Sequence, residues 1–164
     1  MIERESLNEI HELARRNGLD IVAQDTERPW GASFMLEESQ LDAFARTFFP
    51  DLALPEPDRR EKMSPKFLLV APGERLSWQY HHRRREHWRV VWGPVGIAVS
   101  DSDQETEPHV FQAGEEIQIA QGGRHRLVGL DDRGLIAEIW THTDPAHPSD
   151  EDDIVRLQDD YDRS

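Results

Sequence analysis

The chain has 164 residues, enough for one domain with a substantial core, and its hydrophobic content of 37%, with five tryptophans, is typical of a folded globule. It has no cysteine, which excludes disulfides, thiolate metal sites and a cysteine nucleophile. A net charge of −14 argues against a nucleic-acid partner, because a phosphate backbone selects a basic surface. No apolar run reaches the length of a membrane span, and the start, MIERESLNEI, lacks the features of a secretory signal. We therefore expect a cytoplasmic protein with no membrane partner.

Two helices are expected in the N-terminal part of the chain. The first covers residues 6–17, where apolar residues recur at helical spacing, Ser6 and Glu9 form a capping box, and Gly18 follows as a C-terminal cap. The second covers residues 38–49, again from helical spacing of its apolar residues, and ends at a proline.

The rest of the chain is expected to form short strands and loops. Turns rich in Gly, Asp and Pro at regular intervals are typical of an antiparallel sandwich or barrel. We therefore predict an all-β protein with helical additions at the N-terminus. It would comprise an arm over residues 1–60, a barrel core over 66–143 and an acidic, weakly helical tail over 144–164. The expected strands are 21–23, 33–36, 67–71, 76–80, 87–92, 95–100, 110–111, 116–120, 124–130 and 135–141.

One stretch, PGERLSWQYHHRRREHWRVVWG at residues 72–93, concentrates possible metal ligands. Gln79, His81 and Glu86 lie within eight residues, between two turns marked by glycine. Residues two apart in a strand point to the same side, so Gln79 and His81 can face one interior together. His125, inside GGRHRL, is the natural candidate for a fourth ligand. Imidazole, carboxylate and amide donors suit a borderline divalent ion such as zinc, or iron, nickel or manganese.

Arginines surround these candidate ligands in an otherwise acidic protein. A local cationic patch fits a small anionic substrate such as a sugar phosphate, although each arginine could equally pair with one of the surplus carboxylates. The arginines are Arg83, Arg84, Arg85, Arg89, Arg124 and Arg126.

The two glycine-framed segments resemble the paired signature of the cupin family. The first is a glycine, five residues, His-x-His, four residues, Glu, six residues, glycine. The second is a glycine, five residues, Pro-x-Gly, two residues, His, three residues, Asn. Gln79 stands in place of the first histidine, Ala120 in place of the proline, and Gly129 in place of a later asparagine. The resemblance implies a double-stranded β-helix, or jelly-roll barrel, and a homodimer. The matching positions are Gly73, Gln79, His81, Glu86, Gly93, Gly114, Gly122 and His125.

A narrower resemblance is to type II mannose-6-phosphate isomerase, a cupin domain often fused behind a mannose-1-phosphate guanylyltransferase. It implies a divalent ion, usually zinc, held by Gln79, His81, Glu86 and His125, and interconversion of mannose 6-phosphate and fructose 6-phosphate. The segments that carry it are RPWG at 28–31, Lys66, PGERLSWQYHHRRREHW at 72–88, HRL at 125–127 and EDDIVRLQDDY at 151–161. The segment after Glu138 departs from the family pattern, which leaves the substrate open.

An aldose–ketose isomerase needs a general base to move a proton between C1 and C2 through an enediol. Glu138 and His87 are the candidates, and the sequence does not choose between them. Lys66, Arg84 and Arg156 match basic positions of the family and are expected to bind phosphate or hydroxyl groups, and Trp88 is expected to form a pocket wall. Three further histidines have no partner at ligand spacing and are expected at the surface: His109, His142 and His147.

Three other functions stay open at this point. The first is an isomerase or epimerase acting on another sugar phosphate, such as a heptose or pentose phosphate. The second is a metal-dependent cupin oxygenase, because the fold alone does not fix the chemistry. The third is a cupin that binds a sugar phosphate without catalysis.

Overall fold

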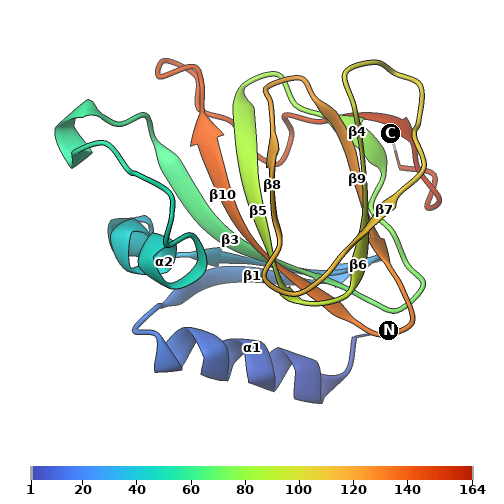
Figure 1. Ribbon diagram of the computed structural model, residues 1–164, viewed down its shortest axis with the longest axis horizontal. Helices are drawn as coiled ribbons and strands as arrows, with labels where there is room; N and C mark the ends of the chain where they lie inside the picture. Colours follow the sequence, from blue (N-terminus) through green and yellow to red (C-terminus); the bar gives the residue numbers. More distant parts are fainter. Residues whose placement is uncertain (1, 164) are drawn as a thin grey trace.

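Two antiparallel sheets enclose the interior of the protein, and two helices lie outside them (Figure 1). The computed structural model describes residues 2–163. The strand order is β1-β2-β3-β10-β5-β8 in the first sheet and β11-β4-β9-β6-β7 in the second. The prediction of an all-β cupin fold with N-terminal helices is therefore confirmed.

The helices are α1 (Arg4–Arg16) and α2 (Leu41–Phe48), with short 3-10 turns at Glu38–Gln40 and Pro57–Arg59. The first-sheet strands are β1 (Ile21–Arg28), β2 (Gly31–Leu36), β3 (Met63–Val70), β5 (Arg84–Trp92), β8 (Glu116–Ile119) and β10 (Gly134–His142). The second-sheet strands are β4 (Trp78–Tyr80), β6 (Val95–Ser100), β7 (His109–Phe111), β9 (Arg124–Gly129) and β11 (Val155–Gln158).

The first sheet is buried on both faces at its centre. Every residue of β3 and of β10 is buried. The buried residues include charged side chains, because Lys66 on β3 and Glu138 on β10 are each only 2% exposed. The two strands pair in register, so that Glu138 lies opposite Lys66 and Trp140 opposite Ser64.

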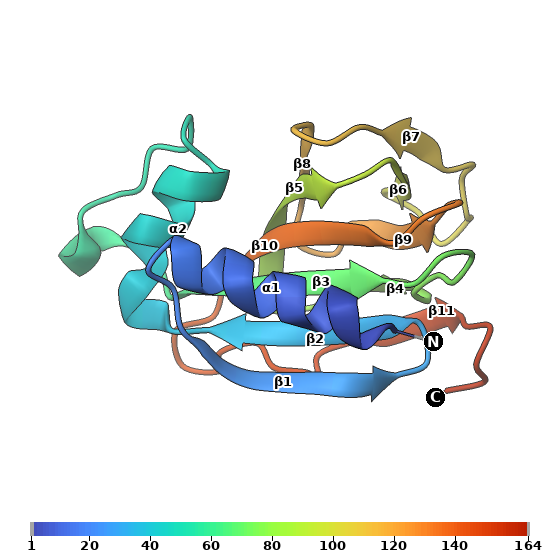
Figure 2. The same cartoon turned by 90° about the horizontal axis from the view of Figure 1, so that it is seen from below.

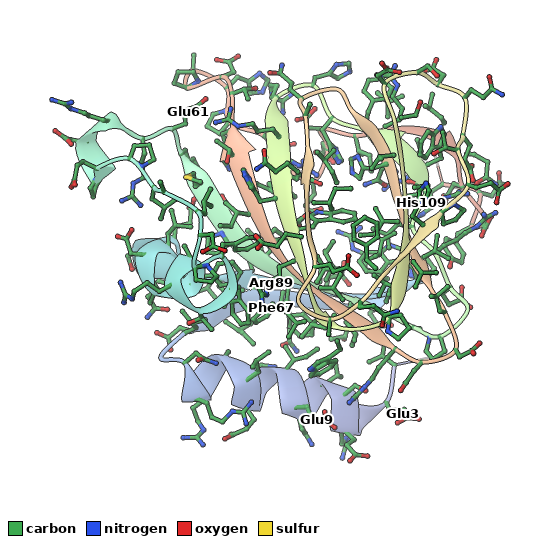
Figure 3. The ribbon with its side chains drawn as sticks, viewed as in Figure 1. Glu3, Glu9, Glu61, Phe67, Arg89 and His109 are labelled. Carbon is green, nitrogen blue, oxygen red and sulfur yellow. The ribbon has the colours of Figure 1, made fainter. Side chains whose placement is uncertain are left out.

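The outer face of this sheet packs against the two helices (Figure 2). Phe67, labelled in Figure 3, belongs to this layer and is fully buried, together with Phe34 and Phe44. Burial of each such aromatic side chain stabilises the fold by about 1.5–3 kcal/mol. The helices therefore close the outer face, and the polar residues of the same strands are left for the interior of the barrel.

The start of α1 differs from the predicted capping box. The helix begins at Arg4, its N-cap residue is Glu3, and no side chain caps it. Instead, Ser6 Oγ and Glu9 Oε2 accept hydrogen bonds from the guanidinium of Arg133, at 2.6 and 2.7 Å. The capping prediction was wrong because a long-range partner takes both side chains.

Gly31 lies where β2 passes closest to β3. Its φ is +156°, and a Cβ atom at this position would lie 1.8 Å from the main-chain oxygen of Leu69. Because such a contact is impossible, only glycine permits β2 to pair with β3 here. The turn RPWG at residues 28–31 therefore sets the spacing of the sheet as well as the direction of the chain.

The C-terminal segment differs most from expectation. Residues 155–158 form β11, which pairs with β4, so the prediction of a weakly helical tail was wrong. In Figure 1 this segment, in red, crosses from the end of β10 to the edge of the second sheet. Val155 lies opposite Tyr80 and Arg156 opposite Gln79, which brings the tail beside the candidate ligands.

Candidate metal centre

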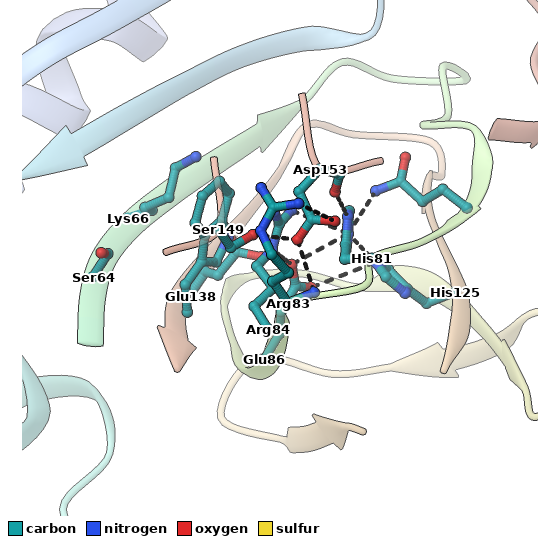
Figure 4. Close-up of polar contacts among 12 residues, drawn as sticks. Ser64, Lys66, His81, Arg83, Arg84, Glu86, His125, Glu138, Ser149 and Asp153 are labelled. Atoms are coloured by element: carbon teal, nitrogen blue, oxygen red, sulfur yellow. Dashed lines mark hydrogen bonds and ion pairs between the residues drawn. The ribbon is translucent and has the colours of Figure 1, made fainter. Parts of the chain in front are cut away.

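Three of the four predicted ligands converge inside the barrel (Figure 4). One ligand atom each from His81, Glu86 and His125 lies within 4.8 Å of the other two, and all three residues are buried. Glu86 lies on β5 and faces the interior in alternation with its neighbours, whereas His125 lies on β9, opposite Gln79 of β4. Two sheets thus contribute to one centre.

Both imidazoles are fixed in the same tautomer by main-chain carbonyls. Nδ1–H of His81 donates to the carbonyl of Asp153 at 2.7 Å, and Nδ1–H of His125 donates to the carbonyl of Gly123 at 2.9 Å. Each Nε2 therefore carries a lone pair, and the two Nε2 atoms lie 3.3 Å apart. This is the arrangement of histidine ligands whose second nitrogen is anchored by the surrounding protein.

The carboxylate of Glu86 lies beside the Nε2 atoms of both histidines, and one of its oxygens lacks a hydrogen-bond donor. Its Oε1 lies 3.5 Å from Nε2 of His81, and its Oε2 lies 3.4 Å from Nε2 of His125. Oε2 is buried and has no hydrogen-bond partner among residues 2–163. A buried carboxylate oxygen without a donor costs free energy, and a bound cation would remove that cost. The donor set therefore fits a divalent metal ion.

The guanidinium of Arg84 supplies positive charge next to these donors. It donates from Nε to Oε1 of Glu86 at 2.9 Å and from one terminal nitrogen to Nε2 of His81 at 3.1 Å. Its carbon also lies 3.5 Å from the ring centre of Trp140. A cation is thus already in contact with two of the candidate ligands.

Gln79 lies beside this cluster with its amide oxygen on Ser77. Ser77 Oγ donates to Oε1 at 2.6 Å, while Nε2 of Gln79 lies 3.5 Å from Nε2 of His81. Turning the amide over would direct its oxygen at the cluster, and the Ser77 hydroxyl could then accept from the amide nitrogen. Gln79 can therefore serve as a fourth ligand without movement of the backbone.

Burial sets the protonation of the ligands. It lowers the pKa of His81 to about 3 and also lowers the pKa of His125, so both imidazoles are neutral at neutral pH. Burial alone would raise the pKa of Glu86, but the charge and hydrogen bond of Arg84, together with the two neighbouring imidazoles, outweigh burial and lower that pKa. Two neutral imidazoles and one carboxylate are the protonation states that bind a metal.

Glu138 is a second buried carboxyl group in the same interior. Its two oxygens accept hydrogen bonds from the indole nitrogens of Trp88, at 2.7 Å, and Trp140, at 2.9 Å. Burial, with the negative charge of Glu86, raises the pKa of Glu138 to about 8. A carboxyl group in a fixed position with a pKa near neutrality can both donate and accept a proton.

We call His81, Glu86 and His125 the metal-type cluster. One cavity is lined both by Glu86 of this cluster and by Glu138. The four predicted substrate-binding residues, Lys66, Arg84, Trp88 and Arg156, all line it. His87 does not: it follows Glu86 on β5, points to the opposite face and contacts Phe49 with ring centres 6.3 Å apart. Adjacent strand residues cannot both face the interior, so the structure does not bring His87 to the site.

His142 is buried, contrary to its predicted surface position, because β10 extends to this residue. Its Nε2 lies 2.8 Å from Ser64 Oγ, and its Nδ1 accepts from the main-chain N–H of Ser149. Ser149 Oγ in turn donates to Asp153 and accepts from Arg84. This chain of hydrogen bonds holds the Arg84 guanidinium in place through its contact with Ser149.

Several residues of the site carried no recognisable signal in the sequence. Asp153 and Ser149 lie in the tail, where nothing local indicates a contact 70 residues away with His82 and Arg83. Trp140 could have been found, because it lies two residues from Glu138 on the same strand and so shares its face.

The fold and the cluster together define a cupin with a His-Glu-His centre able to bind a metal. Residues 37–159 match the family model described as mannose-6-phosphate isomerase C-terminal, and the chain belongs to that family.

Curated relatives extend far beyond the matched region. The mannose-1-phosphate guanylyltransferase ManC of Salmonella typhimurium is 34% identical over 65% of this chain and 20% of its own length. The alginate biosynthesis protein AlgA of Pseudomonas aeruginosa is 33% identical over 60% of this chain and 19% of its own length. The chain thus spans about a fifth of the curated relatives it matches.

Solved structures support the fold. The chain is similar to a mutant of the Bacillus subtilis oxalate decarboxylase OxdC, with a TM-score of 0.58 and 11% identity over 85% of this chain and 32% of that one. It is also similar to a recombinant oxalate oxidase in complex with glycolate, with a TM-score of 0.53 and 18% identity over 81% and 58% of the two chains. In the part of the chain that the structure describes, neither helix has the length and apolarity to cross a membrane.

Proposed function

We propose that this protein is a metal-dependent sugar-phosphate isomerase that interconverts mannose 6-phosphate and fructose 6-phosphate. The observation that carries the proposal is the single cavity lined by Glu86 of the metal-type cluster, by Glu138 and by basic side chains. Membership of a family named for mannose-6-phosphate isomerase supports the substrate, as do relatives named mannose-1-phosphate guanylyltransferases.

The metal would be held by His81, Glu86 and His125, with Gln79 as a fourth ligand, and zinc is the ion that this donor set favours. When bound, such an ion would polarise the sugar carbonyl and stabilise negative charge that develops on its oxygen. Arg84, in contact with Glu86, orients that carboxylate and can donate to a substrate oxygen in the cavity.

Glu138 is the proposed general base. Its ionised form takes the proton from C2 of the aldose, and the resulting acid returns a proton to C1 of the enediol while the O2 hydroxyl proton moves to O1. The two indole donors fix the direction of the carboxyl group, and each oxygen keeps a lone pair for the proton. With a pKa of about 8, a minor fraction of Glu138 is ionised at neutral pH and can act as the base.

The test joins metal analysis to an assay of fructose 6-phosphate formation. We expect about one zinc per chain in the wild type, and the loss of both metal and turnover in His81→Ala. His82→Ala is the matched control, because His82 is the next residue and is exposed. Metal without turnover on mannose 6-phosphate would reject this substrate and direct the assay to heptose and pentose phosphates. Redox-active iron with oxygen consumption would replace the isomerase by an oxygenase, and binding without turnover on any sugar phosphate would leave a binding protein.

Glu138→Gln tests the proposed base separately from metal binding. Glu138→Gln keeps the size of the side chain but removes the proton acceptor, so we expect its metal content to be unchanged and its kcat to fall by about 100-fold or more. A variant with normal metal and normal kcat would exclude Glu138 as the base.

A further inference from the structure

The cavity beside the metal-type cluster is strongly basic on the side of the C-terminal segment. Five cationic side chains line it: Arg28, Lys66, Arg84, Arg156 and Arg163. Its volume is about 60 Å³, which is room for a few water molecules. A sugar phosphate is larger, so part of the wall must move before such a ligand can enter.

Glu151 forms the part of that wall in contact with two of the cations. Its Oε1 accepts from Nζ of Lys66 at 2.7 Å, and its Oε2 accepts from a terminal nitrogen of Arg28 at 3.3 Å. Lys66 is 3% exposed at its side chain, and among residues 2–163 Glu151 is its only ion-pair partner. A buried ammonium group requires an anion, and Glu151 provides it.

The surroundings of Lys66 also suit an anion larger than a carboxylate. Its Nζ lies 3.8 Å from the ring centre of Trp140, and Lys66 and Arg28 both line the cavity. Arg28 keeps a second ion pair, from Nε to Asp25 at 3.0 Å, so its position does not depend on Glu151. An ammonium and a fixed guanidinium that converge on one point form a site for a phosphate group.

Glu151 can leave this position without movement of the backbone. It lies in a turn outside the strands, and 51% of its side chain is exposed. The backbone on either side is anchored independently, by Ser149 to His142 and by Asp153 to His82. Rotation of one side chain therefore opens the subsite without unravelling the segment. The ion pair with Lys66 lowers the pKa of Glu151, so the group is an anion at neutral pH.

We propose that Lys66 and Arg28 form the subsite for the phosphate group of the substrate and that Glu151 occupies this subsite until a phosphate displaces it. The identity of the ligand as a sugar phosphate rests on the proposed function, whereas the exchange of one anion for another does not. The carboxylate thus acts as an internal competitor that every anionic ligand must replace.

The experiment measures binding of inorganic phosphate, mannose 6-phosphate and mannose to the metal-loaded protein by calorimetry. In Glu151→Gln we expect both phosphate ligands to bind about fivefold more tightly, because the competing ion pair is absent, and mannose to bind as in the wild type. Glu61→Gln is the matched control: Glu61 makes a similar exposed ion pair, with Arg85 at 2.6 Å, away from the cavity. Its affinities should not change.

Two further measurements keep the test decisive. Without ligand, Glu151→Gln should melt below the wild type because Lys66 loses its counter-ion, and saturating phosphate should raise its Tm more than that of the wild type. The double variant Lys66→Met, Glu151→Gln should lose the gain in phosphate affinity. Unchanged or weaker phosphate binding by Glu151→Gln would overturn the proposal. If phosphate binding tightens but mannose 6-phosphate is not isomerised, the subsite stands and the proposed function fails.

Discussion

His81, directly after β4, and His125, on β9 of the same sheet, present the same nitrogen to the centre, because each has its other nitrogen bound to a carbonyl group. A metal ligand that is fixed in this way pays less conformational entropy on binding than a free side chain. Gly123 and Asp153 act here through their backbone alone. At the scale of single residues, the site therefore depends on atoms that every amino acid possesses.

Glu138 gives the clearest dependence of stability on pH. Its pKa in the folded protein is about 8, against an ordinary value of 4.5, so the folded state holds a proton that the unfolded state releases. The favourable contribution of the neutral acid is complete below pH 4.5 and is lost as the pH rises through 8. We expect the free energy of unfolding of Glu138→Gln relative to wild type to increase by a few kcal/mol between pH 5 and pH 9.

Urea unfolding of both metal-free proteins at pH 5, 7 and 9 measures this difference. Glu56→Gln, in an exposed loop, provides the control, and its difference from wild type should stay constant with pH. A constant difference for Glu138→Gln as well would show that the buried acid does not have a raised pKa.

Gly31 provides a prediction about packing. Gly31→Ala places a methyl group 1.8 Å from the Leu69 oxygen, so β2 must move away from β3, and we expect a loss of at least about 3 kcal/mol in the free energy of unfolding. Gly18→Ala is the control, since φ there is +69° but no atom lies within 4 Å of the added Cβ. It should cost about 1 kcal/mol, from backbone strain alone. Similar losses in the two variants, measured by urea unfolding, would contradict the role of close approach.

At the scale of secondary-structure elements, the C-terminal segment is part of the site and not an appendage. The carboxylate of Asp153 accepts from the main-chain N–H groups of His82 and Arg83 and from Ser149 Oγ. These bonds hold the turn between β4 and β5. Three predicted ligands lie along this stretch: Gln79 on β4, His81 between the strands and Glu86 on β5. Burial would raise the pKa of Asp153, but these donors outweigh it and lower the pKa to about 2.

Asp153→Asn tests this anchor. An amide can replace only one of the two acceptor oxygens, so we expect the free energy of unfolding to fall by about 2 kcal/mol at pH 7. Because the pKa in the fold is lowered, the contribution is present above pH 3.8 and is lost as the pH falls towards 2. The difference in the free energy of unfolding between wild type and Asp153→Asn, measured by urea unfolding, should therefore become smaller below pH 4. Asp152→Asn, at the exposed neighbouring position, should leave stability within about 0.5 kcal/mol at every pH.

The sequence predicted those parts of the structure that depend on local alternation. Spacing of two residues placed Gln79 and His81 on one face, and the register of β4 with β9 brings His125 opposite. The same alternation would have excluded His87, because its neighbour Glu86 already faces the interior. The pairing of β11 with β4 and the burial of His142 depend on partners far away in the sequence, which no local pattern encodes.

At the scale of the whole molecule, the homodimer expected from the cupin resemblance remains a prediction. Within residues 2–163, β1 is the longest strand at the end of a sheet, and Val22 on it is 55% exposed. An edge of this length is a ready surface for pairing with a second copy. We expect Val22→Lys to raise the dimer dissociation constant about tenfold, measured by analytical ultracentrifugation.

Val110→Lys is the matched control, because Val110 is 59% exposed but lies on β7, a short strand at the end of the other sheet. Its dissociation constant should equal that of the wild type. A wild-type protein that sediments as a single chain at micromolar concentration would rule out the dimer.

The hydrogen bond between His81 and the carbonyl of Asp153 also bears on the order in which the protein is made. Chains leave the ribosome from the N-terminus, so His81, Glu86 and His125 emerge before residue 153. Until then the first imidazole has no acceptor to fix its orientation, and the nascent barrel would bind an ion loosely. A metal ion that binds this centre would therefore meet a fully oriented set of ligands only after the C-terminal segment has joined the barrel.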